Sequence, residues 1–128
     1  MSDQFPAVAS SLLINDTIVS HTSLVGEGHP NLHPAVWRFV EELPEDQRGR
    51  FTGRCAEAVL ISDQLWRLDS ERSGEPPVSI TEAAPHFAGA AMTSRMIRPQ
   101  GDADHGKPTR PCSACSALIE ALGIQFIG

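Results

Sequence analysis

The sequence lacks the features that direct a chain to a membrane or to secretion. Its apolar runs all stop short of the roughly 18 residues that a membrane-spanning helix needs. The N-terminal segment, Met1 to Phe5, has no basic-then-apolar order of the kind that signal peptides share. We therefore expect a cytoplasmic protein that makes no contact with membranes.

Cations and aromatic rings are also scarce. The 10 Lys and Arg residues are outnumbered by 16 Asp and Glu, which gives a net charge of −6 and a pI near 5.2. Such a surface does not attract phosphate backbones as a whole, and five Phe with two Trp provide few rings for stacking on bases. The composition therefore argues against bulk nucleic-acid binding. Local phosphate contact is still compatible with two short cationic stretches, which hold Arg48, Arg50 and Arg54, and Arg95, Arg98, Lys107 and Arg110.

The length and the remaining composition indicate a single globular domain. A chain of 128 residues suffices for one core, and 41% apolar with 20% charged residues is typical of folded proteins. We predict one domain over residues 1–128. Within it, residues 1–45 form an N-terminal hairpin and helix, and residues 50–128 form the core that carries the site.

The spacing of apolar residues and breakers predicts strands and helices along the chain. A tight turn at Asn15 and Asp16 separates two strands, and Pro44 and Gly123 each end a helix. Trp37 and Trp66 stand at helical spacing and are predicted to be in the core. The predicted elements are strands over 9–14 and 17–19, a helix over 36–43, a loop over 45–53, a helix over 54–68, a connection over 70–77, a turn over 81–85, a central strand over 87–97, a loop over 98–111, a helix over 112–122 and a terminal strand over 124–127.

The three cysteines favour a metal site or a catalytic site over a disulfide, because their number is odd and no secretion signal accompanies them. Cys112 and Cys115 stand three positions apart at the start of a predicted helix, so both sulfurs face the same way. Pro111 suits the first turn of that helix, whose positive end favours thiolates. A C-x-x-C pair on its own also occurs in redox dithiols and in structural zinc knuckles.

Cys55 begins another predicted helix, with Glu57 two residues later. A C-x-E motif followed downstream by P-C-x-x-C resembles the zinc nucleobase deaminases. From about Arg50 to the C-terminus the chain resembles the bacterial YwqJ-related deaminases, whereas the first ~45 residues match no family that we identify. The segments that carry this resemblance are Gly53 to Glu57, Ser62 to Trp66, His105 with Gly106, Pro111 to Cys115, Ala117 with Leu118, and Leu122 to Ile124.

The resemblance implies an α/β fold, a three-layer α/β/α sandwich of the cytidine-deaminase type with a mixed sheet. It assigns zinc to Cys55, Cys112 and Cys115 with a fourth position open to water, and it makes Glu57 the proton shuttle. Cytidine deaminases with three cysteine ligands place an Arg directly after the Glu, where this chain has Ala58. Arg54 or Arg110 is then expected to offset the thiolate charge or to contact a phosphate.

Other residues near the two motifs are candidates for substrate contact, namely Phe51, Ala56, His105 and Ser113. His105 is also a candidate fourth ligand, in which case the zinc site would be structural. The remaining histidines, His21, His29, His33 and His86, have no motif around them and are assigned to surface or loop positions without a role.

The function that the resemblance implies is zinc-dependent hydrolytic deamination of a nucleobase, cytosine ahead of adenine or guanine, in a nucleotide or a single-stranded nucleic acid. The family often forms the toxic tip of larger secreted bacterial proteins, which implies delivery into a target cell and an immunity protein as partner. Assembly into a homo-oligomer is a further expectation. Two alternatives stay open: a biosynthetic deaminase of a free base or nucleoside, and a non-catalytic zinc-binding interaction module.

Overall fold

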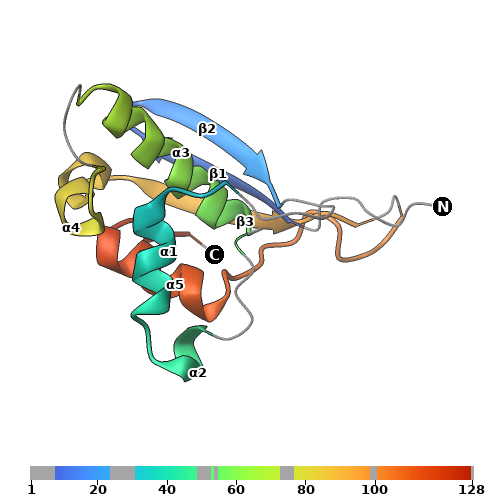
Figure 1. Cartoon of the computed structure of the whole chain (residues 1–128). Helices are drawn as coiled ribbons and strands as arrows, with labels where there is room; N and C mark the ends of the chain where they lie inside the picture. Colours follow the sequence, from blue (N-terminus) through green and yellow to red (C-terminus); the bar gives the residue numbers. More distant parts are fainter. Residues whose placement is uncertain are drawn as a thin grey trace.

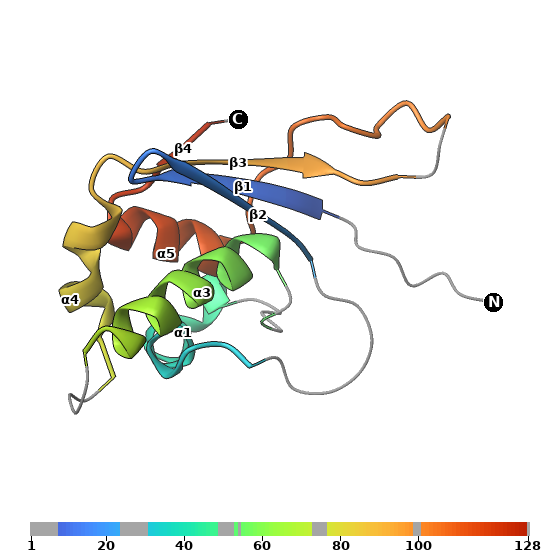
Figure 2. The same cartoon turned by 90° about the horizontal axis from the view of Figure 1, so that it is seen from above.

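The computed structural model describes residues 8–23, 31–48, 53, 55–72, 77–98 and 101–127. These residues form a four-stranded sheet with helices packed against it (Figures 1 and 2). In chain order the elements are β1 (Val8–Ile14), β2 (Thr17–Thr22), α1 (Pro34–Glu41), α2 (Glu45–Arg48), α3 (Ala56–Ser70), α4 (Ile80–Ala83), the 3-10 helix η1 (Ala84–Phe87), β3 (Ala91–Met96), α5 (Ser113–Leu122) and β4 (Gln125–Phe126).

The sheet is mixed and has the strand order β2-β1-β3-β4. β1 pairs antiparallel with β2 and β3, and β3 pairs parallel with β4. The hairpin between β1 and β2 turns at Asn15 and Asp16, whose φ angles of 50° and 63° are those that a two-residue hairpin turn requires. The hairpin and the central position of β3 confirm the sequence-based prediction.

Helices cover one face of this sheet. Figure 2 shows all the labelled helices on the same side of the strands, and α3 packs against β1 and β2. The predicted α/β class with a mixed sheet is confirmed, but the described residues form no third layer, and on the open face Ile18 is 70% exposed. Among the described residues, no helix is both long and apolar enough to span a bilayer. The largest side chains buried between sheet and helices are Leu12, Leu60, Ile61, Leu65, Phe87, Met92, Leu118 and Leu122.

Two predictions of irregular structure are wrong, because both regions contain short helices. The predicted loop over 45–53 includes α2, which begins after Pro44. The predicted turn over 81–85 is α4 followed by η1, and a capping box between Ser79 and Glu82 begins α4. As a result β3 starts at Ala91 and not at position 87. A helix of one turn offers no repeat from which its period can be read.

His33 and Trp66 also differ from their predicted positions. His33 is fully buried, and its Nδ1 accepts a hydrogen bond of 3.0 Å from the Ala35 backbone N–H at the start of α1. The ring proton therefore lies on Nε2, which donates to Asp69 Oδ2 at 2.6 Å. Trp66 is 37% exposed, packs beside the His33 ring at a centroid distance of 4.7 Å, and donates to the Asn31 carbonyl oxygen. The hydrogen bond from His33 to Asp69 joins the start of α1 to α3, and it explains why this buried position holds a histidine.

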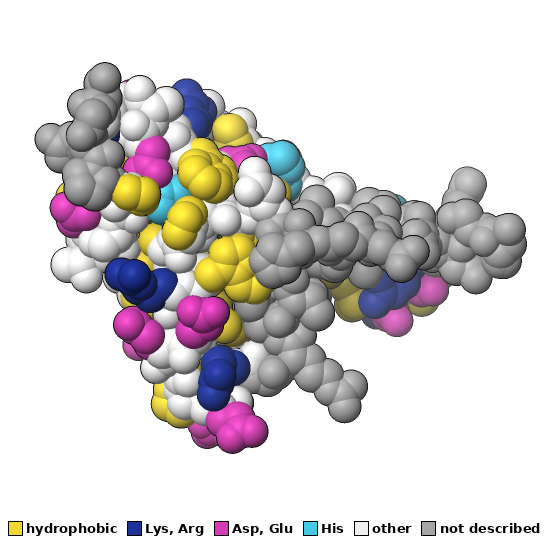
Figure 3. All heavy atoms as spheres, in the orientation of Figure 1, with side chains coloured by type: hydrophobic (Ala, Val, Ile, Leu, Met, Phe, Trp, Pro, Cys, Tyr) yellow, Lys and Arg dark blue, Asp and Glu magenta, His cyan; other side chains and the backbone are white. Residues whose placement is uncertain are grey.

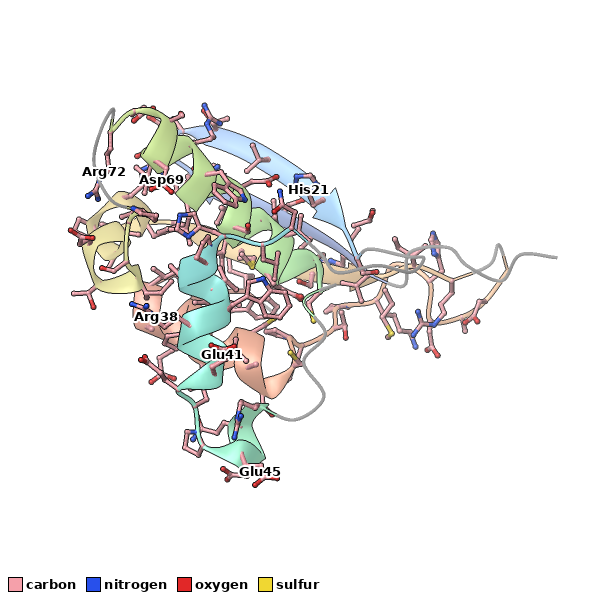
Figure 4. All side chains as sticks on the ribbon, viewed as in Figure 1. His21, Arg38, Glu41, Glu45, Asp69 and Arg72 are labelled. Carbon is pink, nitrogen blue, oxygen red and sulfur yellow. The ribbon has the colours of Figure 1, made fainter. Side chains whose placement is uncertain are left out.

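The hydrogen bond between His33 and Asp69 makes the stability of the fold depend on pH. Asp69 lies near the C-terminal end of α3 (Figure 4). Burial raises the pKa of Asp69, but hydrogen bonds from the Val78 N–H and the His33 ring outweigh burial and lower the pKa below its usual value of 3.8. A carboxyl with a lowered folded-state pKa stabilises the fold above its unfolded pKa. That contribution is lost as the pH falls through the lower value.

We expect Asp69→Ala to reduce the free energy of unfolding by about 2 kcal/mol at neutral pH, because it leaves the buried His33 ring without its acceptor. The measurement is urea unfolding of wild type and variant at a series of pH values. The difference between them should stay constant above about pH 4 and shrink below it. A difference that is unchanged in strong acid would contradict this account of Asp69.

Candidate metal centre and active site

The three cysteines lie at the beginnings of two helices. Cys55 is the N-cap residue of α3, Cys112 is the N-cap residue of α5, and Cys115 lies one turn into α5. Their Sγ atoms all lie within 4.8 Å of one another, and the Cys55 and Cys112 sulfurs are 3.8 Å apart. Cys115 is buried, Cys55 is half-buried and Cys112 is exposed, so the group is open to solvent on one side. Residues 57 positions apart in the sequence are thus brought together.

This sulfur group fits a zinc ion. Tetrahedral zinc with Zn–S bonds of about 2.3 Å places two ligand sulfurs about 3.8 Å apart, which matches the distance between Cys55 and Cys112. No other His, Cys, Asp or Glu in the described part of the chain joins the group. Three protein ligands with an open fourth position are typical of catalytic zinc, whereas structural zinc usually has four.

Hydrogen bonds within the sulfur group separate the pKa values of the thiols. Donation from the Cys115 and Cys55 thiols, helped by the backbone N–H groups of Cys115 and Ala114, lowers the pKa of Cys112 to about 2. The hydrogen bond to Cys112 raises the pKa of Cys55 to about 12, and the same interaction with burial raises the pKa of Cys115. Cys112 is therefore the thiol of this group that loses its proton first. Binding of a metal to all three sulfurs releases the remaining protons.

Glu57 lies in the first turn of α3, next to this group, and is 3% exposed. Its charge contributes to the raised pKa of Cys55, which places the two residues within electrostatic reach. Glu57 Oε2 accepts a hydrogen bond of 2.7 Å from Ser94 Oγ on β3. Ser94 Oγ is in turn 2.6 Å from Ser10 Oγ on β1. A buried carboxylate beside three thiols is thus held from the sheet.

Sequence reasoning missed both serines. The alternation of buried and exposed residues along the strands does contain a signal. Ser10 and Ser94 stand on the helix-facing side of β1 and β3, where the neighbouring residues Leu12 and Met92 are apolar and buried. Without the register of β1 and β3, however, nothing in the sequence pairs two positions 84 residues apart.

The other predicted site residues divide into three groups. Ala56 and Ser113 each directly follow a cysteine. Ala56 is buried in the first turn of α3, and Ser113 is exposed in the first turn of α5. His105 does not join the sulfur group, and its Nδ1 accepts a hydrogen bond of 2.9 Å from the Arg98 backbone N–H. This arrangement gives no support to a fourth ligand at His105. Phe51 and Arg54 lie outside the described residues.

The segment between β3 and α5 carries three cations of the second cationic stretch, Arg98, Lys107 and Arg110, whereas Arg95 lies in β3 itself. The segment folds back on β3, since the Met96 N–H donates to the Lys107 carbonyl oxygen at 2.9 Å and the Thr109 N–H donates to that of Ser94 at 3.0 Å. Figures 1 and 2 show it extending beyond the sheet, in orange, before it returns to α5. Arg110 is exposed at this return, two residues before Cys112, and lines a cleft of about 480 Å³ beside α5 and β4.

No continuous basic surface appears on the face of the molecule in Figure 3. Lys and Arg side chains of the described residues lie scattered there among Asp and Glu.

The comparison with protein families agrees with this geometry. A family model described as YwqJ-like deaminase matches residues 3–124. The chain belongs to the YwqJ-like deaminase family. The match includes residues 3–45, for which the sequence motifs alone gave no resemblance. A search of curated proteins and a search of solved structures each return no match.

In this deaminase-family chain, Gly53 lies two residues before Cys55 at a position that suits glycine alone. It is buried with φ +83°, and a Cβ at this position would lie 2.6 Å from Trp37 Cη2 and 3.0 Å from Leu32 Cδ1. Both the backbone conformation and the close contact therefore require glycine.

Gly53→Ala is expected to lower the free energy of unfolding by about 2 to 4 kcal/mol, since strain of the left-handed backbone and overpacking add together. Urea unfolding measures the loss. Gly89→Ala is the matched control, because Gly89 has φ +80° but a Cβ there meets nothing within 4 Å. The control should lose only the backbone part, about 1 to 2 kcal/mol. Equal losses in the two variants would show that the contact with Trp37 is unimportant.

Proposed function

We propose that this chain is a zinc-dependent hydrolytic deaminase that acts on cytosine ahead of adenine or guanine, presented in a nucleotide or a single-stranded nucleic acid. The observation that carries the proposal is the meeting of three cysteine sulfurs within 4.8 Å at two helix N-termini, beside the buried Glu57, in a member of a deaminase family. A three-ligand group with an adjacent buried carboxylate suits hydrolysis better than a closed structural site.

In this proposal Cys55, Cys112 and Cys115 hold the zinc. When bound, zinc supplies the Lewis acidity that brings the ionisation of water to near-neutral pH. Glu57 accepts a proton from the attacking water and passes it to the ring nitrogen, while the water oxygen adds to the ring carbon that bears the amino group. Glu57 then transfers the second water proton to the amino group, which leaves as ammonia, and the ring carbon becomes a carbonyl. One water is consumed for each ammonia released.

The form of the substrate is inferred from the placement of charge. Residues 95–110 hold four Lys and Arg against two Asp, in a chain whose net charge is −6. This segment begins beside Ser94, whose hydroxyl contacts Glu57, and ends two residues before Cys112. Cations at both ends of the site-forming segment favour a substrate that carries phosphate over a free base.

The test is ammonia release by the zinc-loaded protein from cytidine, CMP, dCTP, adenosine and guanine compounds, single-stranded DNA and RNA. Release from the phosphate-bearing cytosine compounds is the expected result. Release from free bases or nucleosides alone would favour the small-molecule alternative. A protein that holds one zinc and releases no ammonia from any of them would overturn the proposal and favour a non-catalytic zinc module.

The toxin role and the immunity partner are part of the same proposal and have a separate test. Expression of the chain in a bacterial host should slow growth, and expression of the Glu57→Ala variant should not. Equal growth with both would contradict the toxin role without bearing on the reaction.

A further inference from the structure

Two buried hydroxyls interrupt the apolar side of the sheet. The helix-facing residues of β1 and β3 include Leu12, Ile14 and Met92, which are all buried, yet this row also contains Ser10 and Ser94, at 2% and 1% exposure. The two serines are direct partners in the antiparallel register of β1 and β3. Burial of a hydroxyl in such surroundings is unfavourable unless the group is hydrogen-bonded. The presence of a serine pair here therefore needs a reason.

The hydrogen bonds supply that reason and give the pair a direction. Ser94 Oγ donates to Glu57 Oε2 at 2.7 Å. Because a hydroxyl has a single proton, the contact of 2.6 Å between Ser94 and Ser10 is one in which Ser10 donates. The chain of hydrogen bonds thus runs from β1 through β3 to the carboxylate on α3.

The same bonds distinguish the two oxygens of the carboxylate. Oε2 is held by Ser94, whereas Oε1 has no hydrogen-bond partner among the described residues. A charged acceptor that is held by a neutral donor in a buried place forms a strong and directional bond. The bond restricts rotation of the Glu57 carboxylate and leaves one oxygen available.

We propose that Ser94 is a positioning residue for Glu57, that Ser10 supports it, and that Oε1 is the oxygen that exchanges protons with water and substrate. The inference rests on the proposed deamination, in which Glu57 is the proton shuttle. Ser94 itself touches no reacting atom. Its contribution is to keep Oε1 in one orientation through every step.

The first test needs no substrate. Thermal unfolding of the zinc-loaded full chain is compared for wild type, Ser94→Ala, Glu57→Ala and the double variant. Ser94→Ala should lower Tm by about 5 °C in wild type, because a buried carboxylate loses its donor, and by less than about 2 °C when Glu57 is already Ala. Equal shifts in both backgrounds would overturn the inference. Should Ser94→Ala fail to fold, Ser10→Ala in the same two backgrounds decides in its place.

The second test measures turnover on the substrate that the ammonia assay identifies. Ser94→Ala should lower kcat by about 10- to 100-fold with KM within about twofold and zinc content unchanged, and Ser94→Thr, which restores the hydroxyl, should recover most of kcat. Ser11→Ala on β1 is the matched control, because the Ser11 hydroxyl also takes part in a cross-strand bond, 2.7 Å from Ser20 Oγ on β2, but that bond is exposed. The control should keep wild-type kcat. A Ser94→Ala variant with wild-type kcat would overturn the inference.

The two proposals fail in distinguishable ways. If the wild type releases no ammonia from any compound, the proposed function fails, while the Tm comparison still decides whether Ser94 holds Glu57. If the wild type is active but Ser94→Ala and Glu57→Ala show no coupling in Tm, the positioning role alone fails.

Discussion

Replacement of Glu57 by glutamine is expected to lower kcat for deamination by about three orders of magnitude, the middle of the range for loss of a general acid–base group. The amide has nearly the same size as the carboxylate and still accepts the hydrogen bond from Ser94 Oγ. It does not take up a proton from water at neutral pH, so the transfer to the ring nitrogen and the amino group is lost. Steady-state ammonia release by zinc-loaded wild type and variant measures the effect.

Zinc content distinguishes loss of chemistry from loss of the site. Glu57 lies outside the group of mutually close ligand atoms formed by Cys55, Cys112 and Cys115, so Glu57→Gln should retain one zinc per chain. Glu120→Gln is the matched control, since Glu120 is an exposed glutamate on the other cysteine-bearing helix, and it should leave kcat unchanged. Wild-type turnover by Glu57→Gln would remove Glu57 from the mechanism.

The two cysteine-bearing helices could be predicted because their signals are local. Cys112 and Cys115 are one turn apart, and Cys55 and Glu57 occupy neighbouring positions of a first turn, so helical geometry alone places each pair on one end of a helix. The hairpin at Asn15 and Asp16 is equally local. Each of these features depends on residues within a few positions of one another, and the structure agrees with all of them.

The residues that support the site could not be predicted in the same way, because their partners are distant in the sequence. Ser94 is 37 positions from Glu57 and 84 positions from Ser10 in the sequence. The contact between the two serines depends on the register of β1 and β3, and the contact with Glu57 depends on how α3 packs on the sheet. His33 contacts Asp69, 36 positions away, which explains why its burial was missed. A polar residue at a buried position is costly without its partner, and sequence alone does not show that partner.

Zinc binding is expected to depend on all three cysteines. Cys115→Ser is expected to weaken zinc binding by more than about a hundredfold, since even loss of a partner of a ligand can cost that much. The hydroxyl of serine is a poorer zinc ligand than thiolate, and only two sulfurs remain. Zinc titration against a competing chelator measures the affinity. Addition of zinc should raise the Tm of the wild type and leave that of the variant unchanged.

Comparison of Cys112→Ser with Cys115→Ser distinguishes the role of the cysteines in zinc binding from their role in packing. Both variants should lose zinc, because each removes one of three sulfurs that lie within 4.8 Å of one another. In the metal-free proteins their stabilities should differ, since Cys112 is exposed and Cys115 is buried. A hydroxyl at the buried position costs about 1 to 3 kcal/mol if it lacks a partner, and one at the exposed position costs little. Zinc affinity that survives in either variant would mean that the three sulfurs do not act as one ligand set, and the open-site argument for hydrolysis would then fail with it.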